Sequence, residues 1–292
     1  MARWTELTLA AGLAALPAAT ADAVDLPPVP ELPPAGPAHD FGGFYLRGDF
    51  GEGFEPAPTL KIEPPPAAGV LSPYAAQGFG NPSLSPSAMA DVGVGYKPND
   101  WLRFDVTLEY RGGASLKSAY ALNDPASPAF GAASMRGNVS ALVGLFNGYI
   151  DLPGLWGVTP FVGAGVGFAV NALSGVSMGG AYWTQAGGLR PAAGAFARGA
   201  ETNFAWALMA GLDYEIVPGI ELELSYRRLD LGRVATGGFS CLAGGAFGAV
   251  LCGTGAPVLS ARHALASNDI RIGLIWAMGE AAAPRAPIVA GD

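Results

Sequence analysis

Apolar and polar residues alternate with a period of two along eight segments of this chain. In residues 101–111 (WLRFDVTLEYR), apolar side chains occupy the even positions from Leu102 to Tyr110, and charged or polar ones the odd positions from Arg103 to Arg111. Because successive side chains of a strand point to opposite faces, this pattern predicts a strand with one apolar and one charged face. Strands of transmembrane barrels, with lipid outside and a polar lumen inside, have this pattern.

The other alternating segments are of similar length. The full set is 43–51, 87–97, 101–111, 137–151, 158–170, 203–217, 220–231 and 268–278. A tilted strand needs about 9–11 residues to cross a bilayer, and each segment reaches or approaches that length. The sequence therefore predicts an all-β fold, an eight-stranded antiparallel transmembrane up-and-down β-barrel with long external loops.

Short and long connections alternate between these segments. The short ones, 98–100, 152–157 and 218–219, carry Pro, Gly, Asn or Asp, which favour turns. The long ones, 52–86, 112–136, 171–202 and 232–267, are rich in Gly, Ala, Ser and Pro, and we expect them to be loops. Outer-membrane barrels have short periplasmic turns and long external loops. Four structureless loops of this length are uncommon in a compact soluble domain, which weighs against a periplasmic sandwich or a lipocalin-like barrel.

Composition agrees with a barrel. Half of the 292 residues are hydrophobic, yet no apolar stretch after residue 25 approaches the length of a membrane helix. The formal net charge of −8 argues against a nucleic-acid partner, which would require basic patches.

The two ends of the chain differ from its middle. Residues 1–23 read as a secretory signal, with Arg3 before an apolar core and Ala21-Asp22-Ala23 as a cleavage site; a buried N-terminal helix is the alternative. Residues 24–40 are proline-rich and are expected to form a periplasmic leader. We assign residues 41–278 to the barrel and 279–292 to a C-terminal tail. Export of such a barrel implies the outer membrane of a Gram-negative cell.

The inward face of the predicted strands carries eight acids and five arginines. The set is Arg47, Asp49, Asp91, Arg103, Asp105, Glu109, Arg111, Asp213, Glu215, Glu221, Glu223, Arg227 and Arg271. A buried ion costs several kcal/mol unless it is paired, so we expect a lumen charge network of ion pairs between strands. Eight strands enclose an interior that side chains just fill, and a wide pore does not follow.

The facing of residues 137–151 is ambiguous. Val139, Val143 and Leu145 suggest one phase, whereas Leu142, Phe146 and Ile150 suggest the other. A β-bulge near Gly144 could reconcile the two phases.

Few residues are candidates for chemistry. Cys241 and Cys252 are expected to form a disulfide in an oxidising compartment; an unpaired structural pair and a metal site are the alternatives. The histidines are His39 and His263, both outside the predicted strands, and Ser260 lies three residues before His263. No phosphate-loop motif, HExxH or convincing carboxylate dyad is present, so we expect no cofactor and no enzymatic activity. An outer-membrane lipid hydrolase or acyltransferase remains the least favoured function.

Several segments together resemble a known family. They are ADAVDLPPVPELPP, GFYLRGDFG, LFNGYIDL, TPFVGAGVGFA and NDIRIGLIW. They look like the alphaproteobacterial opacity-type outer-membrane barrels, eight-stranded, porin-like surface proteins, and the resemblance covers essentially the whole mature chain. It implies a structural or surface-interaction role through the external loops, with a small cation-preferring porin as the alternative. The implied partners are outer-membrane lipids and lipopolysaccharide, the barrel assembly machinery, and an external ligand or surface partner at the loops. One departure is that Trp276-Ala277-Met278 is followed by fourteen more residues, whereas such barrels usually end on an aromatic residue.

Overall fold

The structure is a computed structural model that describes most of the chain after residue 42. The described residues are 43–56, 60–63, 80–123, 130–154, 156–184, 188–243, 258–261 and 265–278. The predicted signal, leader and tail lie outside these ranges, as do His39, His263 and Cys252, so the claims that rest on them stay predictions.

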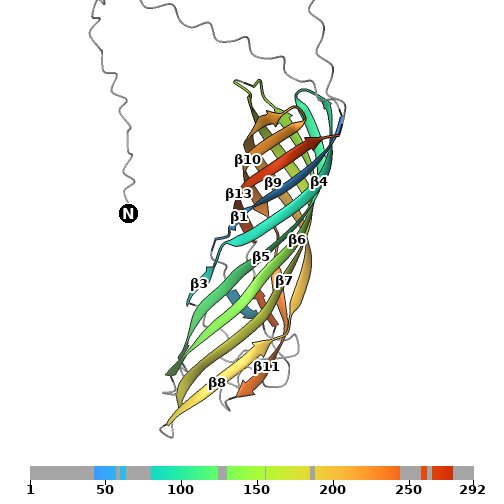
Figure 1. The fold of residues 1–292 in the computed structure, drawn as a ribbon. Helices are drawn as coiled ribbons and strands as arrows, with labels where there is room; N and C mark the ends of the chain where they lie inside the picture. Colours follow the sequence, from blue (N-terminus) through green and yellow to red (C-terminus); the bar gives the residue numbers. More distant parts are fainter. Residues whose placement is uncertain are drawn as a thin grey trace, which may run out of the picture. The chain divides into compact units, whose positions relative to one another are not determined.

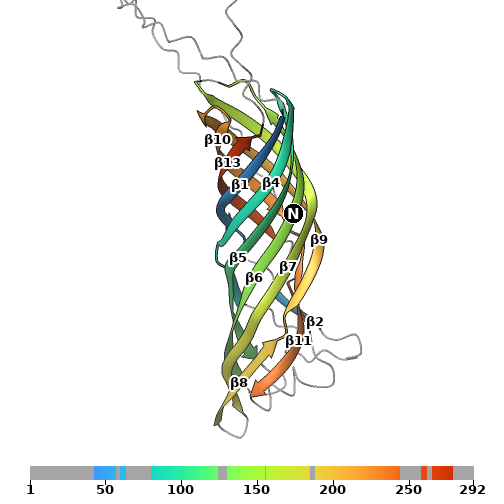
Figure 2. The ribbon, with the colours of Figure 1, turned by 45° about the vertical axis from the view of Figure 1, so that its right-hand side comes forward.

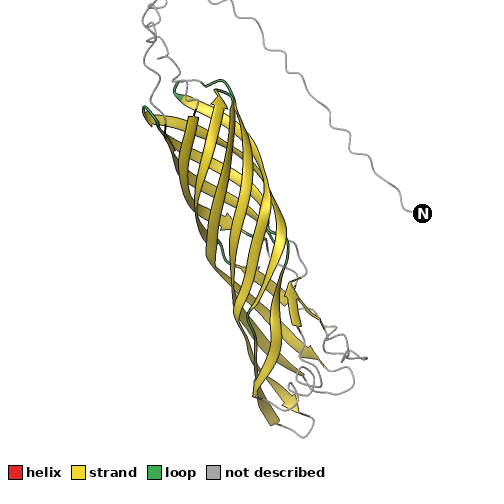
Figure 3. Cartoon of the chain, turned by 90° about the vertical axis from the view of Figure 1, so that its right-hand side faces the viewer, coloured by secondary structure: helices red, strands yellow, loops and turns green. Residues whose placement is uncertain are grey.

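Eight antiparallel strands form a closed ring (Figures 1 and 3). They are β1 (Gly43–Phe54), β4 (Ser87–Asn99), β5 (Leu102–Asn123), β6 (Phe130–Asp151), β7 (Val158–Thr184), β9 (Gly199–Val217), β10 (Ile220–Asp230) and β13 (Ala266–Ala277). Pairing of β1 with β13 and of β7 with β9 closes the ring. Each predicted strand segment corresponds to one ring strand, and the predicted eight-stranded barrel is confirmed.

The outer surface of the ring is an apolar belt. Each ring strand contributes exposed large apolar side chains to it, such as Phe44, Leu46, Val92, Val94, Val106, Leu108, Leu142, Phe146, Val162, Val166, Leu208, Leu212, Leu224, Ile270 and Leu274. Exposed aromatic residues lie at both ends of the belt. Tyr96, Tyr214 and Trp276 lie near the short turns, and Tyr110, Trp206 and Tyr226 lie near the opposite end, which we call the mouth. This is the distribution expected at two membrane interfaces.

The prediction that residues 112–136 and 171–202 form loops is in part wrong. Three ring strands, β5, β6 and β7, continue into these segments, far past the belt. Strands β5 and β6 have 22 residues each and β7 has 27. At about 3.3 Å per residue, β7 runs for roughly 90 Å along its axis, although about 9–11 residues suffice to cross a bilayer. Figure 2 shows these strands continuing beyond the ring, toward the bottom of the view, where β8 and β11 lie.

Shorter strands complete this second region. They are β2 (Leu60–Glu63), β3 (Gly80–Leu84), β8 (Gly188–Phe196), β11 (Val234–Ala243) and β12 (Val258–Ala261). With the far parts of β5, β6 and β7 they form a sheet in the order β3-β5-β6-β7-β8-β11-β12-β2. We call this sheet the extension; it comprises residues 114–123, 130–139 and 174–184 together with the five short strands. The sequence did not predict the extension, because its strands are rich in Gly, Ala and Ser and their two faces differ little in polarity.

Two irregularities separate the ring from the extension. In β5 the register shifts between Arg111 and Ala114, where Gly113 has a φ of 81°. In β7 a similar shift lies near Gly175, whose φ is 61°. Glycine adopts such left-handed backbone without the penalty of a Cβ. Inward positions therefore change from odd to even numbers in β5 and β7.

The bulge predicted near Gly144 is wrong, because β6 keeps one phase throughout. Its odd-numbered residues, from Ala133 to Asp151, face inward apart from partial exposure at Val139. Val143 and Leu145 are buried, whereas Leu142 and Phe146 are exposed. The apolar inward residues of β6 belong to a core that fills the mouth side of the ring and continues into the extension, with Leu116, Met135, Val176, Met178, Phe196 and Val234.

Candidate functional site

Charged side chains fill the rest of the interior. Eleven of the thirteen predicted lumen residues are no more than 6% exposed, and they come from β1, β4, β5, β9, β10 and β13. They are Arg47, Asp49, Asp91, Arg103, Asp105, Glu109, Arg111, Asp213, Glu223, Arg227 and Arg271. In this structure nearly every one of them takes part in ion pairs between strands.

The group nearest the turns is centred on Arg103. Its Nε lies 2.9 Å from Asp151 Oδ1, and its Nη2 lies 2.8 Å from Asp213 Oδ2. The guanidinium carbon also lies 5.0 Å from the ring centroids of Tyr149 and Phe161. Arg103 therefore joins β5, β6, β7 and β9 while two carboxylates neutralise its charge.

Arg47 holds the middle of the interior together. It donates to Asp49 at 2.8 Å, to Asp105 at 2.9 Å and to Glu223 at 3.0 Å. Its Nη1 also donates to the Tyr149 hydroxyl oxygen at 2.9 Å. These partners come from β1, β5, β6 and β10, so one guanidinium spans the barrel.

A smaller cluster lies beside it. Arg271 of β13 donates to Asp91 of β4 at 2.6 Å and lies 3.0 Å from Asp49 of β1. It thereby links three neighbouring strands, β13, β1 and β4.

The group nearest the mouth contains two arginines. Arg111 lies 2.9 Å from Glu109 and 2.8 Å from Asp269. Arg227 pairs with the same two carboxylates. Both guanidinium groups also donate to the Met89 sulfur, at 3.2 and 3.3 Å. Each of the two arginines pairs with both carboxylates, so the two positive and two negative charges of this group balance.

Glu215 and Glu221 stand apart from this network. They lie opposite each other on β9 and β10, beside the turn at residues 218–219, and both are only partly buried. Neither takes part in the ion pairs formed among the described residues. Glu215 Oε1 is buried and has no hydrogen-bond partner among the described residues.

The sequence missed other members of the network. Asp269 has the same inward parity as Arg271 and could have been found from the alternation. Asp151, Tyr149 and Asn147 all lie in the segment 137–151, whose facing was ambiguous. The sequence therefore did not place their polar groups inside the barrel. Asn147 donates to Asp105 at 2.7 Å.

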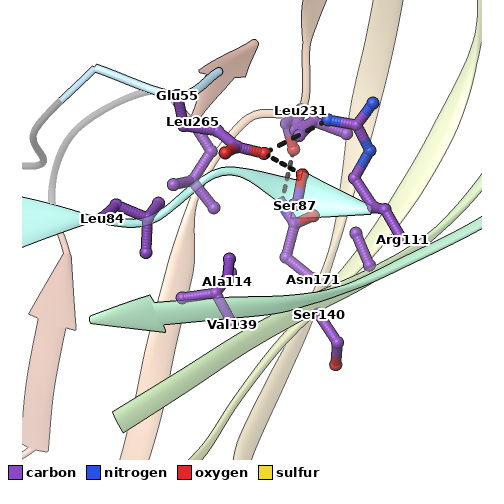
Figure 4. Close-up of a pocket in the computed structure, with 11 residues that line it drawn as sticks. Glu55, Leu84, Ser87, Arg111, Ala114, Val139, Ser140, Asn171, Leu231 and Leu265 are labelled. Carbon is purple, nitrogen blue, oxygen red and sulfur yellow. Dashed lines mark hydrogen bonds and ion pairs between the residues drawn. The ribbon is translucent and has the colours of Figure 1, made fainter. Parts of the chain in front are cut away.

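A pocket lies above the charged layers, at the mouth of the ring. It has about 270 Å³ of free space, including its open side, and it is lined by residues of β3, β4, β5, β6 and β7 and by residues that adjoin β1, β10 and β13 (Figure 4). The lining is Glu55, Leu84, Ser87, Arg111, Ala114, Val139, Ser140, Ala141, Asn171, Leu231 and Leu265. Glu55, Ser87 and Arg111 converge on one side of it.

One oxygen of Glu55 is fully engaged in this pocket and the other is not. Oε1 accepts from the Ser87 hydroxyl at 2.6 Å and from Arg111 at 3.3 Å. Oε2 is buried and has no hydrogen-bond partner among the described residues. Burial raises the pKa of the Glu55 carboxyl above its ordinary value, and the Ser87 hydrogen bond and the Arg111 charge oppose that shift. The alternation of apolar and polar residues did not predict that Glu55 is buried, because Glu55 follows the last residue of β1.

These features define an integral membrane β-barrel: a closed ring, an apolar belt with aromatic ends, and a charged interior. Residues 8–249 match the family model described as outer membrane protein beta-barrel domain, and the chain belongs to that family. It is an outer-membrane protein. This match does not establish the narrower opacity-type family that the sequence resembles.

The chain is also similar to proteins of Brucella and Rickettsia. An uncharacterized protein of Brucella abortus is 32% identical over 210 residues, which cover 66% of this chain and 69% of the relative. A protein of Rickettsia massiliae named "Putative adhesin" is 30% identical over 151 residues, which cover 49% of this chain and 58% of the relative.

Solved outer-membrane structures resemble the chain more remotely. OprG from Pseudomonas aeruginosa is 12% identical with a TM-score of 0.43, and the match covers 82% of this chain and 97% of that one. Neisserial surface protein A is 14% identical with a TM-score of 0.32, covering 80% and 97%.

Proposed function

We propose that this protein is a non-enzymatic surface protein, in which a closed outer-membrane barrel holds the extension outside the cell as an interaction surface. The observation that carries the proposal is the length of β5, β6 and β7. About half of each strand lies beyond the apolar belt, and the buried core of the ring continues into this part. A barrel that served only to anchor itself would not require a core that extends beyond the belt.

The tip of the extension supports a binding role. Trp183 and Leu189 lie opposite each other across the β7–β8 hairpin, and they are 45% and 57% exposed. Exposed large apolar side chains away from the membrane belt commonly mark interaction sites, and tryptophan is enriched among the residues that dominate interface energies. The Rickettsia relatives with adhesin names point to the same class of role.

The interior supports a closed barrel rather than a pore. Arg103, Arg227, Tyr149 and Phe161 are among the largest side chains with less than 2% exposure. In a water-filled channel such residues would be accessible to solvent. The ion pairs also engage most of the interior carboxylates, which leaves the small cation-preferring porin as the weaker alternative.

Adherence of whole cells tests the proposal. The chain would be produced in a non-adherent Gram-negative strain, and adherence to cultured epithelial cells and between bacteria would be measured. Trp183→Ser should reduce adherence, and Trp156→Ser, at a turn on the opposite end of the barrel, should not. Surface amounts and the heat-modifiable gel shift would confirm equal folding. Equal adherence by cells with and without the wild-type protein would contradict an adhesive role.

A further inference from the structure

The pocket at the mouth contains two buried acceptors that lack donors. Besides Glu55 Oε2, Asn171 Oδ1 is buried without a partner among the described residues. The Glu55 side chain is 5% exposed, and Asn171 is fully buried. An unsatisfied buried acceptor costs about 1–3 kcal/mol, more when it is charged, so the pair indicates a donor that the described residues do not supply.

Hydrogen bonds fix the orientation of Asn171. Its Nδ2 donates to the backbone carbonyl oxygens of Leu231 at 2.6 Å and of Arg233 at 2.9 Å. Both amide protons are therefore used, and turning the amide over would lose both bonds. Asn171 Oδ1 can only accept a hydrogen bond.

The charge balance around Glu55 favours a cation. Arg111 is the nearest guanidinium, but it already pairs with Glu109 at 2.9 Å and Asp269 at 2.8 Å, and its contact with Glu55 is longer, at 3.3 Å. Since Arg227 shares the same two carboxylates, the two arginines neutralise Glu109 and Asp269. The charge of Glu55 is left with little compensation.

The remaining lining limits the kind of cation. Leu84, Ala114, Val139, Leu231 and Leu265 are apolar, which suits an alkyl chain. The enclosed part of the pocket has room for one group the size of a water molecule, which an ammonium head matches. Ca²⁺ or Mg²⁺ is a poor fit because each prefers six or more oxygen ligands, and among the described residues no group of three His, Cys, Asp or Glu could hold a metal ion.

We propose that this mouth pocket binds a primary ammonium group carried on a short alkyl chain, such as an alkylamine or a lysine side chain presented from outside the cell. The ammonium donates to Glu55 Oε2 and Asn171 Oδ1, and the alkyl chain packs on the leucines. The site is independent of the adhesive role proposed above, because it uses none of the residues at the tip of the extension.

Binding of n-butylammonium chloride to the refolded full chain in detergent tests this site. Saturation-transfer NMR would detect the bound ligand, and the side-chain Nε–Hε resonance of Arg111 would localise it. Wild-type protein should bind n-butylammonium, and 1-butanol, which has the same alkyl chain without charge, should bind at least about tenfold more weakly, a difference of about 1.4 kcal/mol.

Two variants and a matched control separate charge from space. Glu55→Gln removes the charge, and Leu84→Trp fills the pocket without changing the charge; each should weaken binding at least about tenfold. Glu52→Gln removes a carboxylate three residues away that is exposed on the outer face of β1, and it should leave binding unchanged. Leu84→Trp also keeps the test decisive if Glu55→Gln fails to give the heat-modifiable barrel.

Three results would overturn the proposal. They are no saturation of wild-type protein up to roughly 100 mM ligand, equal affinities for n-butylammonium and 1-butanol, and equal binding by wild type and by folded Glu55→Gln and Leu84→Trp. The first result would mean that the pocket holds only water.

Discussion

Replacing Arg47 with methionine should destabilise the barrel strongly, because Arg47 pairs with three buried carboxylates. The side chain donates five hydrogen bonds, two to Asp49 and one each to Asp105, Tyr149 and Glu223. Methionine has a similar length and fills most of the same space, so lost charge pairing dominates the effect. Removing one partner of a buried ion pair costs about 3–5 kcal/mol.

The remaining contacts set the expected value within that range. After the change Asp49 keeps Arg271 at 3.0 Å, and Asp105 keeps Asn147 at 2.7 Å. Glu223 loses the guanidinium that satisfies its Oε1, and its Oε2 has no partner among the described residues. We therefore expect a loss near the lower end, about 3 kcal/mol, with most of it arising at Glu223.

Urea unfolding of the refolded protein in lipid vesicles would measure this loss, followed by tryptophan fluorescence and by the heat-modifiable gel shift. Arg198→Met is the control, since Arg198 is exposed between β8 and β9 and should cost less than about 0.5 kcal/mol. Adding Glu223→Gln to Arg47→Met should recover at least about 1 kcal/mol in a double-mutant cycle. A loss for Arg47→Met no larger than that for Arg198→Met would show that the interior is wet and that its charges are solvated.

Further predictions concern the belt, the barrel, the cysteines and the pocket. Val106→Arg, in the middle of the belt, should cost about 2–4 kcal/mol in the same titration, whereas Ser134→Arg, on the exposed face of the extension, should cost less than about 0.5 kcal/mol; equal losses would refute the assigned membrane position. Unboiled and boiled protein should migrate differently on a gel, and a helical circular dichroism spectrum would be incompatible with the fold. Cys241 and Cys252 should be bridged in protein taken from outer membranes, as peptide mass spectrometry can establish; two free thiols would exclude the bridge. Because burial raises the pKa of Glu55, binding of n-butylammonium should weaken on acidification at a higher pH than for an ordinary glutamate, as the carboxyl becomes neutral; pH-independent binding would contradict this assignment.

The ring could be predicted from the sequence because its two environments differ sharply in polarity. In β10 the residues Glu221, Glu223 and Arg227 alternate with Leu222 and the other apolar residues of the belt, and this contrast specifies both the strand and its facing. The alternation fixes facing but not partners. Nothing in the sequence indicates that Arg47 reaches Glu223 across the barrel, since that contact depends on closure and on strand register.

The extension was not predicted because its environments differ little. Its strands have water on one side and a core of small and medium side chains on the other, so Ala, Gly and Ser occur on both faces. The bulges near Gly113 and Gly175 then shift the phase of β5 and β7, and an alternation continued from the ring would assign the wrong face.

The mouth pocket was missed for a different reason. Glu55 lies just past the end of β1, and Asn171 lies at the beginning of a segment that reads as a loop. They are brought together only when β1 and β7 take their places in the closed ring. A site assembled from several strands of a closed ring has no spacing signature in the sequence.

Conductance in a planar lipid bilayer tests the central claim, that side chains and ion pairs close the barrel. Purified protein that shows the heat-modifiable shift would be inserted, and current would be recorded under voltage and under a salt gradient. The packed interior predicts no stable unitary conductance for the wild type; any rare opening should be narrow and prefer cations, because the interior acids outnumber the arginines. Stable, reproducible unitary currents, or a preference for anions, would contradict the closed interior described above.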